Sequence, residues 1–298
     1  MPIGSPYALD KLAPSEVSAA LDIFHGKKIF FDGVFKGDYS LAIVNRQLAL
    51  SLIDAGVDLT VFTPEEDWRT DEMFNQFPSV FERCTDIYPE RGLFDIHMRN
   101  TWPPRCEDMI GDFNAYVCFA WEESVAPRAM MDHFNAHLDL MMVTANFVEE
   151  SFRSSGLVIP ITVVGNGTDH LAADMVGIAV ERPERRRILH VSSCFPRKGA
   201  DLLVQAFAEE FAAKDNVELL IKTFDNPHNT IAQYVQDVSA AHPGAPPMKV
   251  MAASLPKDEL AALIQSASVF AAPSRGEGFG LPLAEALLLN VPVVTTNY

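Results

Sequence analysis

The sequence lacks the features that define several common protein classes. Its 298 residues include only four cysteines and no Cys-x-x-Cys pair, so neither a disulfide scaffold nor a zinc ribbon is predicted. No run of about twenty apolar residues occurs, and no transmembrane helix is expected. Residues 1–12 lack the basic and apolar regions of a secretory signal. We therefore expect a cytoplasmic protein without stable membrane insertion.

Positive charge is also scarce, because 23 lysines and arginines face 40 aspartates and glutamates and give a formal net charge of −17. Binding to nucleic acid or to anionic lipid depends on clustered cations, so neither partner is expected. Signatures of P-loop, metalloprotease and nucleophile-elbow chemistry are absent, as is any Asp-x-Asp. An anionic ligand would need a local group of cations in so acidic a chain.

The apolar content of 48% and the chain length are sufficient for two hydrophobic cores. Apolar runs with strand character alternate with helical patterns along both halves, which predicts an α/β protein with two Rossmann-like domains. We predict the following organisation: an N-terminal extension at 1–26, a first domain at 27–169, a linker at 170–186 and a second domain at 187–298.

The most informative stretch runs from Ser268 to Asn290. It predicts a short strand, a turn with three glycines, and a helix that begins near Pro282. Glu277 lies in the turn and Glu285 lies one turn into the helix. A helix N-terminus after a strand is the usual ligand-binding position in a parallel sheet, although a glycine-rich turn alone is also explained by tight packing.

The complete string Pro-Ser-Arg-Gly-Glu-Gly-Phe-Gly-Leu-Pro-Leu-Ala-Glu-Ala, from Pro273 to Ala286, resembles the signature of the retaining GT-B glycosyltransferases of group 1. Gly165-Asn-Gly-Thr-Asp169 resembles the connection between the two domains in that family. The resemblance implies a GT-B fold, with two Rossmann-like domains facing a central cleft. Because family members continue beyond the position of Tyr298, it also implies an incomplete second domain.

The resemblance assigns roles to residues of the second domain. Glu277 is expected to bind hydroxyls of the transferred sugar, Glu285 the donor ribose, and Lys198, at the start of a helix, the diphosphate. Ser193 stands where many relatives have an arginine, so either Arg197 supplies the second positive charge or the diphosphate is held by Lys198 with backbone donors and hydroxyls. The backbone donors implied lie in the turn and at the start of its helix, at Gly278, Phe279, Gly280 and Leu281.

Candidates in the first half are less specific. The resemblance places the loop with Gly33, Gly37 and Ser40 beside the donor phosphates, but a plain turn explains these residues equally well. Glu122 or Glu123 would contact the donor sugar, with a solvated acidic face as the alternative. His97, at the end of an expected strand, is interpreted as a packing residue.

We therefore expect a hexosyltransferase that uses a nucleoside diphosphate sugar without cofactor or metal ion. The acceptor would be a saccharide or a saccharide-lipid of bacterial surface-polysaccharide assembly. A likeness to mannosyltransferases around Trp121 and Ser192–Gly199 makes GDP-mannose the first donor hypothesis. The alternatives are a GT-B epimerase or phosphorylase, and a non-catalytic donor-binding or scaffolding module. The sequence leaves the oligomeric state open.

Overall fold

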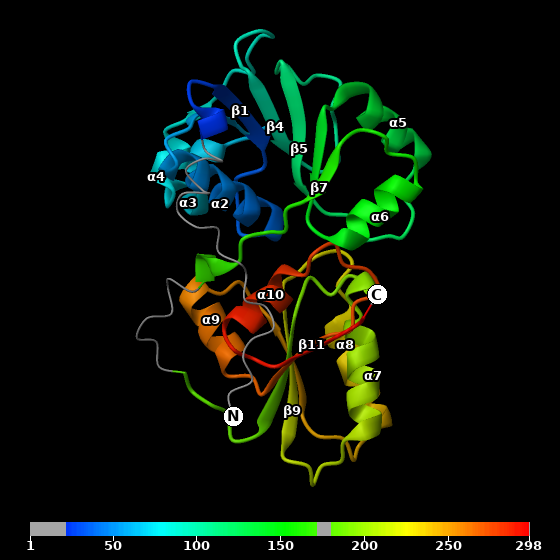
Figure 1. Cartoon of the computed structure of the whole chain (residues 1–298). Coiled ribbons are helices and arrows are strands. Elements are labelled where there is room, and N and C mark those ends of the chain that lie inside the picture. Colours follow the sequence, from blue (N-terminus) through cyan, green and yellow to red (C-terminus); the bar gives the residue numbers. More distant parts are fainter. Residues whose placement is uncertain (1–21, 172–179, 298) are drawn as a thin grey trace, which may run out of the picture. The chain divides into compact units, whose positions relative to one another are not determined.

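The computed structural model describes residues 22–171 and 180–297 (Figure 1). The chain divides into two compact units, which are described separately. The first unit contains residues 1–117 and 133–141, and the second contains 118–132 and 142–298. Much of the predicted extension and half of the predicted linker lie outside the described residues. The boundaries at residues 169 and 187 therefore stay predictions.

A seven-stranded sheet has the order β3-β2-β1-β4-β5-β6-β7, and its pairings from β3 to β5 are parallel. Its strands are β1 (Lys28–Gly33), β2 (Asp58–Phe62), β3 (Cys84–Thr85), β4 (Ile96–Asn100), β5 (Phe113–Phe119), β6 (Leu140–Val143) and β7 (Ile161–Val163). The helices along this part of the chain are η1 (Asp22–Phe24), α2 (Ser40–Asp54), η2 (Trp68–Thr70), α3 (Glu72–Asn75), α4 (Pro78–Phe81), α5 (Arg128–His137) and α6 (Asn146–Ser154).

A five-stranded parallel sheet lies wholly in the second unit and has the order β10-β9-β8-β11-β12. Its strands are β8 (Arg186–Val191), β9 (Val217–Thr223), β10 (Met248–Ala252), β11 (Val269–Ala272) and β12 (Val293–Thr295). The helices are η3 (Asp169–Leu171), η5 (Pro196–Lys198), α7 (Ala200–Glu210), α8 (Ile231–Ala241), α9 (Lys257–Gln265) and α10 (Leu281–Leu288).

Two hydrophobic clusters form the core of this five-stranded sheet. Leu189 of β8 packs in one cluster with side chains of α9 and α10, and Leu219 of β9 packs in the other with side chains of α7 and α8. The two helix pairs lie on opposite sides of the strands in Figure 1. Strands covered on both faces are continuously apolar, as Leu219–Ile221 shows.

The predicted α/β class is confirmed, and the strand, turn and helix predicted between Ser268 and Asn290 appear as β11, the loop after it and α10. One prediction is wrong, because the helix expected to start at Lys198 begins at Ala200. Lys198 instead ends the short 3₁₀ turn η5, and Gly199 follows with a φ of 69°. That left-handed conformation cannot continue a right-handed helix and separates the two elements.

The strand order fixes where a ligand site is expected. From β8 the chain builds outward through β9 and β10 on one side and continues with β11 and β12 on the other side. The loops that leave the carboxyl ends of β8 and β11 therefore diverge at a topological switch point, the usual ligand position in such sheets. The β8 loop spans residues 192–199, and the β11 loop spans residues 273–280.

Candidate functional site

The β8 loop and the β11 loop are joined by several direct contacts. Arg275 donates to both carboxylate oxygens of Asp201 at 2.7 and 2.8 Å and to the carbonyl of Pro196. Its own backbone N–H donates to the carbonyl of Arg197 at 2.7 Å. A Cβ on Gly199 would lie 2.0 Å from the carbonyl oxygen of Pro273. Only glycine therefore permits this approach of the two loops.

A buried histidine also links the strand ends from which these two loops leave. His190 Nδ1 lies 2.7 Å from the carbonyl oxygen of Ala271, and Nε2 lies 2.7 Å from the Ser192 hydroxyl. Because a carbonyl only accepts, Nδ1 carries the proton and a neutral His190 accepts from Ser192 through Nε2. Burial lowers the pKa of His190, which favours this neutral form. His190 thus connects the ends of β8 and β11.

Four charged side chains of the second unit alternate in sign at this junction. Glu122 Oε1 lies 2.9 Å from Arg197 Nη2, and Arg197 Nη1 lies 4.0 Å from Glu277 Oε1. Lys198 Nζ lies 2.5 Å from Glu277 Oε2. We call these four residues the donor-side cluster, after the role that the sequence analysis predicts for Lys198 and Glu277. They are partly accessible, with exposed side-chain fractions between 15% for Lys198 and 37% for Arg197.

The donor-side cluster carries equal numbers of positive and negative charges, and it is partly exposed to solvent. Burial lowers the pKa of Lys198, and the adjacent Glu277 partly offsets that effect. An anion that replaces water around Lys198 would therefore stabilise its charged form. Both carboxylates only accept hydrogen bonds, and they can exchange their cationic partners for the hydroxyl groups of a ligand.

The turn before α10 has the backbone that its glycines predict. Gly280 precedes the helix with a φ of 80°. This conformation is unfavourable for any residue that has a side chain. The carbonyl of Gly278 accepts a hydrogen bond from the Thr144 hydroxyl at 2.9 Å, and the carbonyl of Gly276 faces Arg197 Nη1 at 3.4 Å. Phe279 also lies in this turn, and Leu281, the first residue of α10, is buried.

Glu285 lies on α10 and is only 5% exposed. Its Oε1 lies 3.1 Å from Nε2 of His170, which belongs to η3. Sequence reasoning missed His170, although it directly follows the Asn-Gly-Thr-Asp motif. It also missed Arg275, which lies inside the string Pro273–Ala286 that carries the resemblance.

Sequence-predicted residues are therefore distributed unequally. The structure brings together Glu122, Arg197, Lys198 and Glu277, whereas Glu123 is exposed and makes no ion pair with the residues that the structure describes. Ser193 lies in the β8 loop, where its carbonyl accepts from Asn226. The roles assigned to all these residues stay predictions.

In the first unit, Gly33 ends β1, Gly37 lies in the loop that follows, and Ser40 begins α2. Side chains hold this loop from several directions. Glu65 accepts from the N–H groups of Phe35 and Lys36, and the buried Arg46 donates to the carbonyls of Phe35 and Gly37. The loop is thus a fixed turn in the first unit, and its predicted proximity to a donor stays a prediction.

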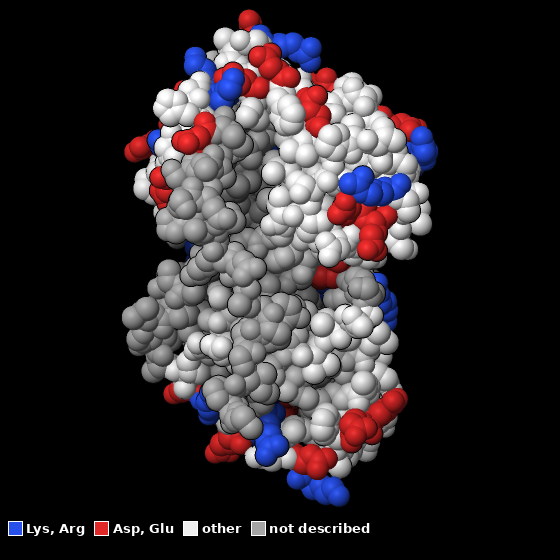
Figure 2. Space-filling view, in the orientation of Figure 1, with Lys and Arg blue, Asp and Glu red and all other residues white. Residues whose placement is uncertain are grey.

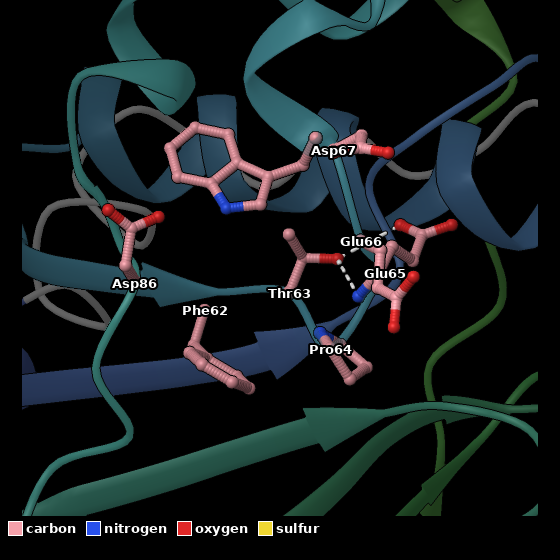
Figure 3. A pocket seen from close by; sticks show the side chains of 8 residues that line it. Phe62, Thr63, Pro64, Glu65, Glu66, Asp67 and Asp86 are labelled. Carbon is pink, nitrogen blue, oxygen red and sulfur yellow. Dashed lines mark hydrogen bonds between the residues drawn. The ribbon is translucent and has the colours of Figure 1, made fainter.

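A hollow of about 450 Å³ lies at the carboxyl end of β2 in the first unit (Figure 3). Its walls include Thr63 and Trp68, and four acidic side chains from Glu65, Glu66, Asp67 and Asp86. Negative walls repel a diphosphate, so this hollow has the wrong charge for the predicted donor. On the face that Figure 2 shows, the described acidic and basic side chains of each unit are interspersed.

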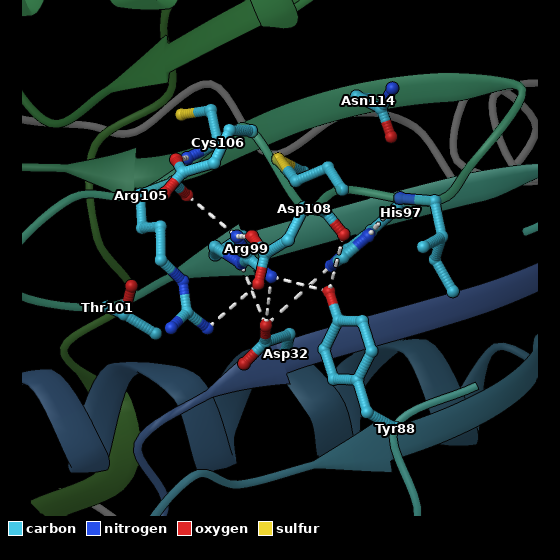
Figure 4. Close-up of polar contacts among 12 residues, drawn as sticks. Asp32, Tyr88, His97, Arg99, Thr101, Arg105, Cys106, Asp108 and Asn114 are labelled. Atoms are coloured by element: carbon cyan, nitrogen blue, oxygen red, sulfur yellow. Dashed lines mark hydrogen bonds and ion pairs between the residues drawn. The ribbon is translucent and has the colours of Figure 1, made fainter. Parts of the chain in front are cut away.

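A buried ionic network fills the carboxyl ends of β1 and β4 in the first unit (Figure 4). Arg99 donates to Asp32 at 2.8 Å, to Asp108 at 2.5 Å and to the Tyr88 hydroxyl at 2.6 Å. Asp32 and Arg99 are each 1% exposed. His97 is fully buried beside them, and its Nδ1 accepts from the N–H of Ile110 at 3.0 Å.

The electrostatics of this network follow from burial. Burial raises the pKa of Asp32 although Arg99 counteracts it, and burial together with Arg99 lowers the pKa of His97 to about 3. His97 is therefore neutral at ordinary pH. The interpretation of His97 as a packing residue is consistent with this geometry.

The described residues offer neither a metal site nor a membrane-spanning helix. Within residues 22–171 and 180–297, no group of three histidine, cysteine or acidic side chains is arranged to hold a metal ion. In the same part of the chain, no helix has the length and apolarity needed to cross a membrane. All four cysteines are free thiols.

Comparison with known proteins shows what the second half resembles. Residues 185–298 match the family model described as glycosyl transferases group 1. This segment is therefore similar to the group 1 glycosyltransferases. The segment contains β8 to β12, the β8 loop and the β11 loop, and therefore Lys198, Glu277 and Glu285.

A curated relative supports this family assignment. The chain is 33% identical over 114 residues to the MMP alpha-(1->4)-mannosyltransferase of Mycolicibacterium hassiacum. That alignment covers 38% of this chain and 26% of the relative. The chain thus matches about a quarter of the length of that relative.

Solved structures resemble nearly the whole chain. A sucrose-phosphate synthase from Thermosynechococcus elongatus aligns with a TM-score of 0.62 and 19% identity, over 90% of this chain and 81% of that one. An Anabaena protein, HepE, solved with UDP-glucose, aligns with a TM-score of 0.54 and 16% identity, over 90% and 80%. The chain has the Rossmann-like fold of GT-B glycosyltransferases, as predicted.

Proposed function

We propose that this chain is a glycosyltransferase that transfers a hexose from a nucleoside diphosphate sugar with retention of anomeric configuration. The observation that carries the proposal is the donor-side cluster, which combines two cations and Glu277 at the switch point of a group 1 segment. The segment's family supplies the reaction class, and the cluster supplies charges of the required kind. GDP-mannose is the first donor proposed, because the curated relative is a mannosyltransferase.

In the proposed reaction, the bond between the anomeric carbon and the β-phosphate oxygen breaks, and the leaving diphosphate takes up the electron pair. Lys198 and Arg197 would stabilise the negative charge that develops on it. The acceptor hydroxyl attacks from the same face, and its proton passes to an oxygen of the departing phosphate. Glu277 would accept hydrogen bonds from hydroxyls of the transferred sugar, and Glu285 from those of the donor ribose.

We propose that the transfer needs no metal ion. Two cationic side chains at the donor-side cluster can provide the charge that a divalent ion supplies in other transferases. The proposed acceptor is a saccharide or a saccharide-lipid used in surface-polysaccharide assembly. The protein would carry out this reaction in the cytoplasm.

A second candidate is a non-catalytic donor-binding or scaffolding module. The balanced cluster favours it, since each cation already has a carboxylate within 4.0 Å, and Ser193 contributes no charge. A module of this kind would bind a nucleotide sugar without transferring the sugar. An epimerase is a third outcome, in which the donor is consumed without an acceptor.

Calorimetric titration of the full-length polypeptide with GDP, UDP and ADP tests the donor site first. One nucleotide is expected to bind, and its sugar conjugate is then assayed with saccharide acceptors, with and without EDTA. Lys198→Ala is expected to lower kcat/KM by about 10²–10³, a typical loss for a group that stabilises developing charge. Lys214→Ala removes an exposed lysine of the same unit and serves as the control.

The outcomes separate the candidates. An α-linked product from an α-linked donor, formed in EDTA, supports retaining and metal-independent transfer. Binding without turnover supports the donor-binding module, and donor turnover without an acceptor supports the epimerase. If none of the three nucleotides binds, the donor-site assignment is wrong.

A further inference from the structure

His170 occupies an unusual position for a histidine that no assigned role explains. It lies in η3 at the end of the Asn-Gly-Thr-Asp motif, and only 3% of its side chain is exposed. The next residue, Leu171, is buried in the same hydrophobic cluster as Ala286 of α10. Leu171 thereby fixes η3 against α10, the helix that carries Glu285.

The polar atoms of His170 are incompletely satisfied. Neither ring nitrogen makes a hydrogen bond of regular geometry with the described residues, although Nε2 lies 3.1 Å from Glu285 Oε1. The distance meets the limit for an ion pair, but the ring is not aligned for a hydrogen bond. Buried polar groups are seldom left without a partner, and exceptions mark places where a ligand or a small rearrangement completes the bonding.

Glu285 also has few partners among the described residues. Its side chain is 6% exposed, and within the described residues it forms no ion pair with a lysine or an arginine. A carboxylate offers about four acceptor sites on two oxygens. His170 can satisfy one of these sites. No lysine or arginine of the described residues pairs with the others, so they are left for donors of a ligand.

We propose that His170 is a positioning residue for Glu285 in nucleotide binding. A small rotation of the ring would align an N–H at Nε2 with Oε1 and fix the carboxylate, while Oε2 and the remaining lone pairs of Oε1 accept from the ribose hydroxyls. This inference rests on the proposed function, because it assumes that Glu285 faces a nucleoside diphosphate. It adds a residue outside the family signature to the donor site.

Histidine suits this task better than a long cationic side chain. A lysine or arginine would bind the carboxylate in a full ion pair and compete directly with hydroxyl donors. The imidazole contributes one donor at Nε2 on a short, stiff side chain, which loses little conformational entropy when it is fixed. The carboxylate then keeps its charge and most of its accepting capacity for a ligand.

The experiment titrates the full-length polypeptide with GDP, UDP and ADP and with their 2′-deoxy counterparts, whose sugar lacks one hydroxyl. For the nucleotide that binds, His170→Ala is expected to raise Kd about tenfold, which corresponds to about 1.4 kcal/mol. His170→Asn keeps an N–H donor and is expected to recover at least part of this loss. His25→Ala, at an exposed histidine of the first unit, is the control.

Two readouts separate positioning from a merely structural role. The effect of His170→Ala is expected to shrink below about twofold in a Glu285→Ala background, because coupled residues are not additive. It is also expected to shrink with the 2′-deoxy nucleotide. Thermal unfolding of each variant checks that the fold is retained, and His170→Asn carries the test if His170→Ala does not fold.

The inference is overturned if a nucleotide binds the wild type and His170→Ala leaves its Kd unchanged. It is also overturned if the loss is equal for the ribose and 2′-deoxy forms, or equal with and without Glu285. A different failure, in which none of the three nucleotides binds the wild type, contradicts the proposed function and this inference together. The failures of the two proposals are thus distinguishable.

Discussion

The chain places two groups of charged residues at the carboxyl ends of parallel strands, and they differ in what surrounds them. In the first unit, Arg99 and Asp32 are sealed from solvent and joined to Tyr88 and Asp108 by short hydrogen bonds. In the second unit, the donor-side cluster keeps between 15% and 37% of each side chain exposed. Most polar atoms of the first group have protein partners, and only Asp32 Oδ1 and the neighbouring His97 Nε2 lack a hydrogen bond from the described residues. The second group can exchange its partners.

The comparison shows that charge at a strand end is not sufficient to mark a ligand site. The network around Arg99 is largely satisfied within the protein, and its burial makes any loss of a partner costly. The donor-side cluster has weaker, partly hydrated ion pairs that a diphosphate can replace. Accessibility and replaceable partners therefore distinguish a candidate ligand site from a structural network.

The largest expected effect comes from breaking the buried network. Arg99→Ala leaves the carboxylates of Asp32 and Asp108 without their shared cation, and should lower the free energy of unfolding by about 3–5 kcal/mol. Urea denaturation measures this loss. Arg105→Ala removes only a partly exposed partner of Asp108 and should cost less than about 1 kcal/mol. Equal effects of the two variants would contradict the distinction.

Acidification should lower the stability of the first unit through His97. The pKa of His97 is lowered to about 3 in the folded state, whereas an unfolded histidine titrates near 6.5. Between these values the unfolded state binds the extra proton, so unfolding becomes more favourable as pH falls, by about 1.4 kcal/mol per pH unit. The raised pKa of Asp32 acts in the opposite direction at the acid end.

Unfolding free energies measured from pH 7 to pH 4 test this expectation. His97→Asn keeps an acceptor for the N–H of Ile110 but cannot titrate in this range. The variant should therefore show a shallower loss of stability than the wild type. Identical pH slopes for the two proteins would exclude His97 as the titrating group.

The smallest expected effect concerns Glu122, which competes with a ligand anion for Arg197. Glu122→Gln removes the competing charge and should lower the Kd of the bound nucleoside diphosphate by about two- to fivefold, because a partly exposed ion pair contributes about 0.2–1 kcal/mol. Calorimetry measures the change. Glu123→Gln, at the exposed neighbour, is the matched control, and a comparable effect there would point to general charge rather than to the pair.

The local elements of the second half were predictable from the sequence, because strand, turn and helix signals there agree with one another. One contiguous string was enough to propose the turn from Gly276 to Gly280 and Glu277 within it. Lys198 was proposed from the β8 loop. The start of α7 was misplaced by two residues, since nothing in the sequence shows that Gly199 adopts a positive φ.

Contacts between distant segments were not predictable in the same way. Glu122 and Arg197 are 75 positions apart, and Asp32 and Arg99 are 67 positions apart. A charged residue after a strand has the same local pattern whether it is buried or solvated, so a single sequence did not reveal the network around Arg99. His170 was missed for the same reason, since its partner lies on α10.

The approach of Gly199 to Pro273 also matters for protein engineering. Because the β8 loop and the β11 loop touch without room for a side chain, and Arg275 spans both, neither loop is an independent module. Transplanting one of them from another transferase would introduce mismatched surfaces at this contact. Chimeras that aim to change donor preference should exchange both loops as one block.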